Sequence, residues 1–212
     1  MPTGTATALT DVRPDGLIAH LPAGVRIEHH TGADIAADPE PWARAYEEVY
    51  AHAIGLSDHC DPPIGERLTR HAGRPGFALV AARATDTAPA TEAHGADAPV
   101  AGYIYGYTLP TDTLWWEGLT PQPAPEYVRE HPGRTVGVCE LLVAPAWRRT
   151  RVGLALFQAF IADRTEERAA ALLADGNDVV LDRYAKYGFE KVGTVEPYPG
   201  WRRHTMVVGA LR

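Results

Sequence analysis

The chain has 212 residues, of which 45% are hydrophobic, and its formal net charge is −7. This length supports one substantial core, so we expect a flexible N-terminal arm over residues 1–23 and a single domain over residues 24–212. The acidic balance and the dispersed basic residues argue against sequence-independent nucleic-acid binding and leave room for a cationic substrate. No signal peptide is recognisable and no apolar run approaches the roughly 18 residues of a membrane span, so we expect a cytoplasmic protein without membrane contact.

Periodicity predicts a first group of strands and helices. Alternating residues indicate a strand at 25–29, and Pro41 marks a helix start, with apolar residues at helical spacing as far as Ala53. We expect a loop over 57–63, a short helix over 64–71, a strand over 77–83 and a long disordered loop over 85–99. Within residues 58–61 the metal-ligand residue types match no zinc spacing, so we expect no metal.

The second half continues the alternation. We expect strands at 100–109, 135–143, 169–174, 189–195 and 205–211, with a proline-rich excursion over 110–132 and a helix over 152–164. A further helix begins at Asn177, whose side chain can cap it, and ends near Tyr187 with Gly188 in a C-terminal turn. This order of elements implies an α/β sheet of mixed direction.

The segment from Glu140 to Leu156 carries the chemical signal. An apolar strand ends at Pro145, a short turn holds Arg148, Arg149 and Arg151, and a helix follows. The first N–H groups of a helix lack internal acceptors, and the helix dipole adds partial positive charge, so this corner suits a pyrophosphate. Gly153 allows close approach of the backbone to such a ligand.

This segment resembles motif A of the GCN5-related N-acetyltransferases, in which an apolar strand leads to Val-x-Pro, an aromatic residue and Arg/Gln-x-x-Gly-x-Gly/Ala. Five residues fit that pattern in register: Val143, Pro145, Trp147, Arg148 and Gly153. Arg151 departs from it, because the family usually has glycine there. Its side chain would either pair with the cofactor phosphates or crowd them.

A second segment, from Asn177 to Phe189, resembles a later helix of the same family. Asn177 and Tyr184 are seven residues apart, about two helical turns, and therefore lie on one face of the helix. The resemblance implies that the Asn177 amide holds the pantetheine arm and that the Tyr184 hydroxyl protonates the departing thiolate. A tyrosine with its ordinary pKa of about 10 is a protonated donor at pH 7.

The resemblance implies the GNAT fold, an α/β (α+β) arrangement with a mixed, mostly antiparallel sheet of about seven strands and about four flanking helices. It also implies an N-acyltransferase that moves an acetyl or similar group from acyl-CoA to an amine by direct attack on the thioester. The acceptor is a small molecule or a protein, and a homodimer is left open. The residues assigned to the cofactor are Leu141, Leu142, Val143, Arg148, Arg149, Thr150, Arg151, Val152, Gly153, Leu154 and Asn177.

Glu140 is the candidate general base, because it is the carboxylate embedded in the apolar strand that leads to the turn and burial raises a carboxyl pKa. A backbone N–H near Leu142 or Val143 would polarise the thioester carbonyl. Trp115 and Trp116 would line the acceptor site.

Structural roles stand beside each assignment. The arginines would otherwise form a solvated turn, Tyr184 a packing residue, Asn177 a cap, Glu140 a hydrogen-bonded structural carboxylate, and the tryptophans a core cover or dimer contact. For the whole chain, the competing hypotheses are a GNAT-like binding or regulatory module without transfer activity and a pocket that catalyses a different biosynthetic step.

Overall fold

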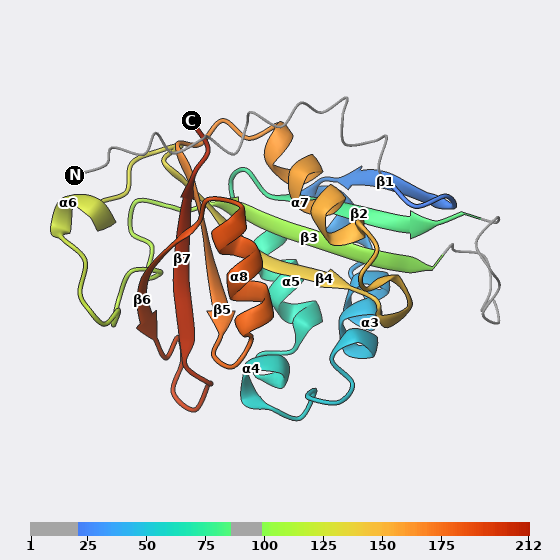
Figure 1. Cartoon of the computed structure of the whole chain (residues 1–212), viewed down its shortest axis with the longest axis horizontal. Helices are drawn as coiled ribbons and strands as arrows, with labels where there is room; N and C mark the ends of the chain where they lie inside the picture. Colours follow the sequence, from blue (N-terminus) through green and yellow to red (C-terminus); the bar gives the residue numbers. More distant parts are fainter. Residues whose placement is uncertain (1–20, 86–98) are drawn as a thin grey trace. The chain divides into compact units, whose positions relative to one another are not determined.

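The structure is a computed structural model that describes residues 21–85 and 99–212. These residues form a mixed seven-stranded sheet in the order β1-β2-β3-β4-β5-β7-β6, together with seven α-helices (Figure 1). The expected α/β sheet of about seven strands is therefore confirmed. Four helices have nine residues or more, as many as expected, and the other three have four to six.

The described chain divides into two compact units that share strand β4. One unit contains residues 21–85, 99–107 and 139–163, and the other contains 108–138 and 164–212. The assignment of residues 24–212 to one domain stays a prediction, and residues 1–20 of the expected arm and 86–98 of the expected loop lie outside the described residues.

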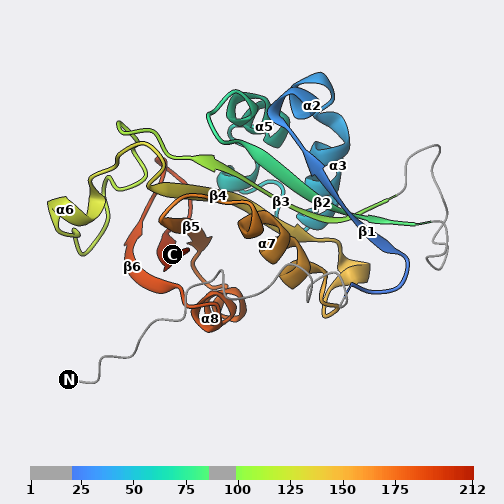
Figure 2. The same ribbon diagram turned by 90° about the horizontal axis from the view of Figure 1, so that it is seen from above.

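The first unit packs helices on both faces of its part of the sheet. Its elements are β1 (Val25–His30), α2 (Gly32–Ala37), α3 (Glu40–Val49), α4 (Ser57–Cys60), α5 (Ile64–Ala72), β2 (Ala78–Ala84), most of β3 (Val100–Thr108), the end of β4 (Thr135–Val143), the 3₁₀ helix η2 (Pro145–Trp147) and α7 (Val152–Ala162). Figure 2 shows α2, α3 and α5 on one face of β1–β3 and α7 on the other.

The core of this unit forms because α3 and α5 each turn an apolar stripe toward β2 and β3. Trp42 and Tyr46 of α3 and Leu68 of α5 are at most 3% exposed, as are Leu79 and Tyr103 of the strands. Proline precedes or begins both helices, which fixes the backbone at their first turns. The buried stripe therefore holds α3 and α5 close to β4, where Glu140 lies.

The second unit joins three strands to one long helix. Its elements are α6 (Pro125–Val128), the start of β4, β5 (Arg168–Ala174), α8 (Asp178–Lys186), β6 (Glu190–Val195) and β7 (His204–Ala210). β4 pairs with β5 in parallel from Thr135 to Val138, and β7 pairs antiparallel with both β5 and β6. Glycine is required at position 209 because a Cβ there would meet the Phe189 ring at 2.9 Å.

The predicted strands are confirmed to within two residues, and the strand 135–143 matches at both ends. The loop expected at 57–63 is wrong in part, because Ser57–Cys60 forms the short helix α4. Asn177 does occupy the N-cap position of α8, but its side chain makes no capping hydrogen bond within the described chain, and its backbone (φ −104°, ψ 56°) lies outside the extended conformation usual at a cap. Gly188 does close this helix, with φ +83°.

Candidate active site

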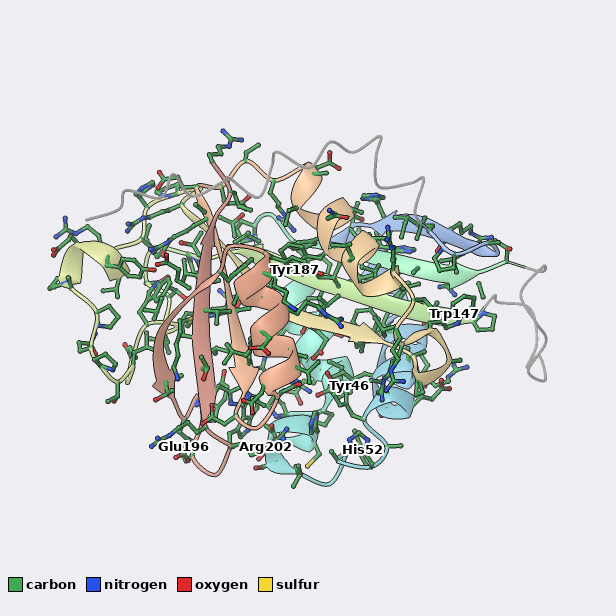
Figure 3. The ribbon with its side chains drawn as sticks, viewed as in Figure 1. Tyr46, His52, Trp147, Tyr187, Glu196 and Arg202 are labelled. Carbon is green, nitrogen blue, oxygen red and sulfur yellow. The ribbon has the colours of Figure 1, made fainter. Side chains whose placement is uncertain are left out.

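The turn between β4 and α7 is built by local hydrogen bonds. Pro145 begins η2, and Trp147, labelled in Figure 3, ends it. The Thr150 hydroxyl donates to the Trp147 carbonyl and accepts weakly from the Val152 N–H at 3.4 Å. Thr150, which the sequence assigned to the cofactor, therefore holds the shape of the turn in the structure.

The N-terminus of α7 has no side-chain cap. Its N-cap residue is Arg151, which makes no capping hydrogen bond, and in the part of the chain that the structure describes the N–H groups of Gly153 and Leu154 donate to no acceptor. Both residues are partly exposed. An eleven-residue helix with free first-turn N–H groups and its positive dipole end directed outward is suited to bind an anion.

Three exposed arginines surround this helix start. Arg148, Arg149 and Arg151 form no ion pair with any carboxylate of the described chain, and only Arg148 makes a side-chain hydrogen bond, from Nε to the Val143 carbonyl at 3.4 Å. Guanidinium groups bind phosphate oxygens through paired N–H donors. The turn therefore adds three available cations to the free N–H groups of α7.

Arg151 fits its position without strain. Its backbone has φ −77° and ψ 8°, a conformation open to any residue, so this turn does not require the glycine that the resemblance expects there. The left-handed residue of the turn is Arg149, with φ +65°. The sequence pattern gave no sign of this, because arginine is not a residue that favours positive φ.

Glu140 lies on β4 in the same unit as this turn. Tyr50 donates a hydrogen bond from its hydroxyl to Glu140 Oε1 at 2.8 Å. Burial raises the pKa of Glu140 above its ordinary value, against the opposite effects of the Tyr50 hydrogen bond and the positive charge of Arg67. The residue as a whole is only partly buried, so solvent reaches part of it. A carboxylate with a raised pKa is a stronger base than one in water.

A cluster of aromatic and polar side chains surrounds Glu140. Tyr46, labelled in Figure 3, comes from α3, and its hydroxyl lies 2.6 Å from His59 Nδ1 of α4. Arg67 of α5 donates to the Tyr46 hydroxyl at 2.9 Å and to the His59 carbonyl at 3.3 Å. The charge of Glu140 contributes to the raised pKa of Tyr46, Tyr50, Tyr103 and Tyr105 after the larger effect of burial. Sequence reasoning found Glu140 but missed this cluster.

Solved structures with this architecture are acetyltransferases. A putative acetyltransferase of the GNAT family from Desulfovibrio desulfuricans matches with a TM-score of 0.55 and 14% identity over 89% of this chain and 99% of that one. The yncA protein of Salmonella typhimurium, solved with acetyl-CoA, matches with a TM-score of 0.53 and 18% identity over 89% and 95%. An aminoglycoside 6'-acetyltransferase type Ii matches with a TM-score of 0.53 and 14% identity over 88% and 97%.

The chain has the GNAT fold. No protein-family model matches it, and no curated protein sequence does. The GNAT fold is therefore shown by the architecture alone. The sequence identities are too low to transfer the substrate of any solved structure to this chain.

Asn177 and Tyr184, from the second segment that resembles the family, lie in the second unit of the structure. Tyr184 is 3% exposed and packs edge-on against Phe189, with ring centroids 4.9 Å apart. The Asn177 carbonyl accepts from the N–H groups of Val180 and Leu181 at the start of α8. These contacts show how the two residues support α8 and its closing turn, and their roles toward a cofactor stay predictions.

The two tryptophans also lie in this second unit. Trp115 is half-buried, and its ring lies so close to Gly137 that a Cβ there would meet it at 2.8 Å. Trp116 is 5% exposed and donates from Nε1 to Glu130 Oε1 at 3.1 Å. Its observed contacts are structural, and a role for either ring in binding an acceptor stays a prediction.

Across residues 21–85 and 99–212, no three His, Cys, Asp or Glu side chains gather as a metal ion would require. Within the same ranges, no helix combines the length and the apolar character of a membrane span.

Proposed function

We propose that this protein is an N-acyltransferase that moves an acetyl or similar acyl group from acyl-CoA to an amine. The observation that supports this most directly is the start of α7, where the N–H groups of Gly153 and Leu154 have no acceptor among the described residues and the guanidinium groups of Arg148, Arg149 and Arg151 are exposed. This corner follows β4, the strand that carries Glu140. The proposed anion site and the proposed base would therefore lie on one continuous segment of the chain.

The start of α7 and the three arginines would hold the diphosphate of coenzyme A. Thr150 and Val152 would shape the turn, and the backbone of Leu141, Leu142 and Val143 would accept the pantetheine arm. Bound acyl-CoA supplies the activated acyl group and the leaving thiolate. An N–H of Leu142 or Val143 would stabilise the negative charge that develops on the thioester oxygen.

Glu140 would accept the proton that the acceptor amine must lose. An alkylamine with a pKa of about 9 to 10 is mostly protonated at pH 7, so attack on a thioester requires this transfer, directly or through water. Burial raises the pKa of the Glu140 carboxyl, which suits that task, and the residue as a whole is only partly buried. Tyr184 and Asn177 keep the roles that the resemblance implies, as the acid for the thiolate and as a support for the pantetheine arm.

The acceptor would be a small molecule or a protein with a free amine, since the architecture is shared with an aminoglycoside acetyltransferase and with NAA60 of Arabidopsis thaliana, which was solved with a bisubstrate analogue. Location in the cytoplasm and assembly into a homodimer are the corresponding expectations for the whole protein. Trp115 and Trp116 remain candidates for contact with the acceptor.

Calorimetry with coenzyme A and acetyl-CoA tests the first step. We expect saturable binding, and the Arg149→Ala/Arg151→Ala variant should weaken it by about tenfold, since each exposed charge contact contributes roughly 0.5–1 kcal/mol. Arg74→Ala, which removes another exposed arginine, is the control. A thiol-release assay with an amine panel then tests turnover, which Glu140→Gln should depress. The absence of cofactor binding would refute the proposal, and tight binding without turnover on any amine would identify a binding module instead.

A further inference from the structure

Tyr50 makes a direct hydrogen bond to the Glu140 carboxylate. It reaches across from the C-terminal end of α3, ninety residues away in sequence, and donates to Oε1 at 2.8 Å. Burial, followed by the charge and hydrogen bond of Glu140, raises the pKa of Tyr50 well above its ordinary value. The phenol therefore stays protonated throughout the pH range in which amines lose their proton, and it remains a donor to Glu140.

The Tyr50 ring packs against two others. Its centroid lies 4.6 Å from the Tyr46 ring and 4.4 Å from the His59 ring. Those two rings are joined by the 2.6 Å contact between the Tyr46 hydroxyl and His59 Nδ1. Arg67 donates to both residues and lies 5.1 Å above the Tyr46 ring. Each partner of Tyr50 is thus fixed by a second contact.

We infer that Tyr50 is a positioning residue for the Glu140 carboxylate, and that Tyr46, His59 and Arg67 hold the Tyr50 ring in place for it. The inference rests on the proposed role of Glu140 as base. It gives a function to His59, whose segment the sequence marked as a loop that contains metal-ligand residue types. A ring packed against two others loses little freedom when its hydroxyl donates, so the carboxylate is presented in one orientation.

Several elements place titratable or charged groups around Glu140 and the tyrosines near it. They are Tyr46 of α3, Tyr50 at its C-cap, Asp58 and His59 of α4, Arg67 of α5, Tyr103 and Tyr105 of β3, and Cys139 of β4. Among these, Tyr50 is the side chain that donates directly to the carboxylate, and Arg67 supplies the positive charge. A hydrogen bond to the charged form favours that form, so Tyr50 opposes the effect of burial on the pKa of Glu140.

The test measures Glu140 directly. Protein labelled with ¹³C at the glutamate carboxyl is titrated by NMR, and the spectrum of Glu140→Gln identifies the resonance. In Tyr50→Phe, which keeps the ring and removes the donor, the midpoint of Glu140 should rise by about one pH unit. His59→Ala, which removes one of the two rings packed against Tyr50, should move it in the same direction by less. Tyr198→Phe, on an exposed ring of the other unit, should leave it unchanged.

Kinetics with any amine that the panel identifies provide the second readout. Tyr50→Phe should lower kcat/KM by about tenfold on the acidic side of the profile and should approach the wild-type value at alkaline pH, since a higher pKa delays the charged form. A purely structural role would lower kcat/KM at every pH. An unchanged or lower Glu140 midpoint in Tyr50→Phe refutes the inference. Full activity of Glu140→Gln would instead refute the base in the proposed function.

Discussion

Replacing Glu130 by glutamine removes the negative charge that faces Arg168 in the interior of its unit. The Glu130 side chain is 1% exposed and that of Arg168 is 9% exposed. Glu130 Oε1 accepts three hydrogen bonds, from Trp116 Nε1 at 3.1 Å, the Thr135 hydroxyl at 2.8 Å and Arg168 at 2.9 Å. The guanidinium of Arg168 also lies 4.7 Å from the Trp116 ring centroid and 4.9 Å from that of Tyr127.

The size of the effect follows from this burial. Removing one partner of a buried ion pair leaves the other charge uncompensated and typically costs about 3–5 kcal/mol. Glutamine keeps the shape and one acceptor oxygen, so we expect Glu130→Gln to lose about 3 kcal/mol of unfolding free energy. The double variant Glu130→Gln/Arg168→Met removes both charges and should lose less than the sum of the two single variants, with a coupling energy of about 1–3 kcal/mol.

Denaturant unfolding followed by tryptophan fluorescence and circular dichroism measures these differences. Glu126→Gln, an exposed glutamate on α6, is the matched control and should change stability by no more than about 0.5 kcal/mol. A loss below about 1 kcal/mol for Glu130→Gln, or additivity of the two single variants, would show that the pair is not the structural centre inferred here.

Three further outcomes follow from individual side chains. The Tyr103 hydroxyl is buried without a hydrogen-bond partner in the described chain, so Tyr103→Phe should stabilise the ligand-free protein by about 1 kcal/mol in thermal unfolding; a loss of stability would contradict this. Burial, with the charges of nearby arginines, lowers the pKa of His71 to about 4 from 6.5. The folded state thus binds fewer protons than the unfolded state between these two pH values. Up to about 3 kcal/mol of the unfolding free energy present above pH 6.5 should therefore be lost as the pH falls to 4. The His71→Gln variant should show a much smaller loss over the same pH range. Tyr184→Phe, which keeps the packing on Phe189, should depress kcat more than the affinity for acetyl-CoA, and an unchanged kcat would exclude Tyr184 as the acid.

The long elements were predictable because their signals are local. The apolar run of 135–143 and the helical spacing of 152–162 carry several repeats of one period, so β4 and α7 stand almost where expected. Helices of four to six residues span less than two turns and show no period. α2, α4 and α6 therefore escaped prediction, although the Thr31 and Asp34 capping box was a usable signal for α2.

The candidate site likewise has one part that was predictable from the sequence and one part that was not. The turn after β4 is one continuous segment, so its arginines and Gly153 were found from the sequence. The surroundings of Glu140 come from α3, α4, α5 and β3, and Tyr50 and Arg67 have no sequence relation to it. A tyrosine at the periodic spacing of a helix or strand is usually interpreted as a core residue, and Tyr46 and Tyr103 are indeed core residues. Only packing shows that these tyrosines lie around a carboxylate, to which the Tyr50 hydroxyl donates.

The departure at Arg151 illustrates how a pattern and a backbone can differ. A glycine in a turn is required where φ is positive or where a Cβ would collide, and Arg151 meets neither condition on its own backbone, with φ −77°. The positive φ falls instead on Arg149, an arginine in a conformation that costs a non-glycine residue about 1–2 kcal/mol. Within the described chain the guanidinium groups of this turn are exposed and pair with no carboxylate, which agrees with the anion site proposed above. Arg151, the residue that breaks the sequence pattern, is therefore compatible with the cofactor role proposed for this turn.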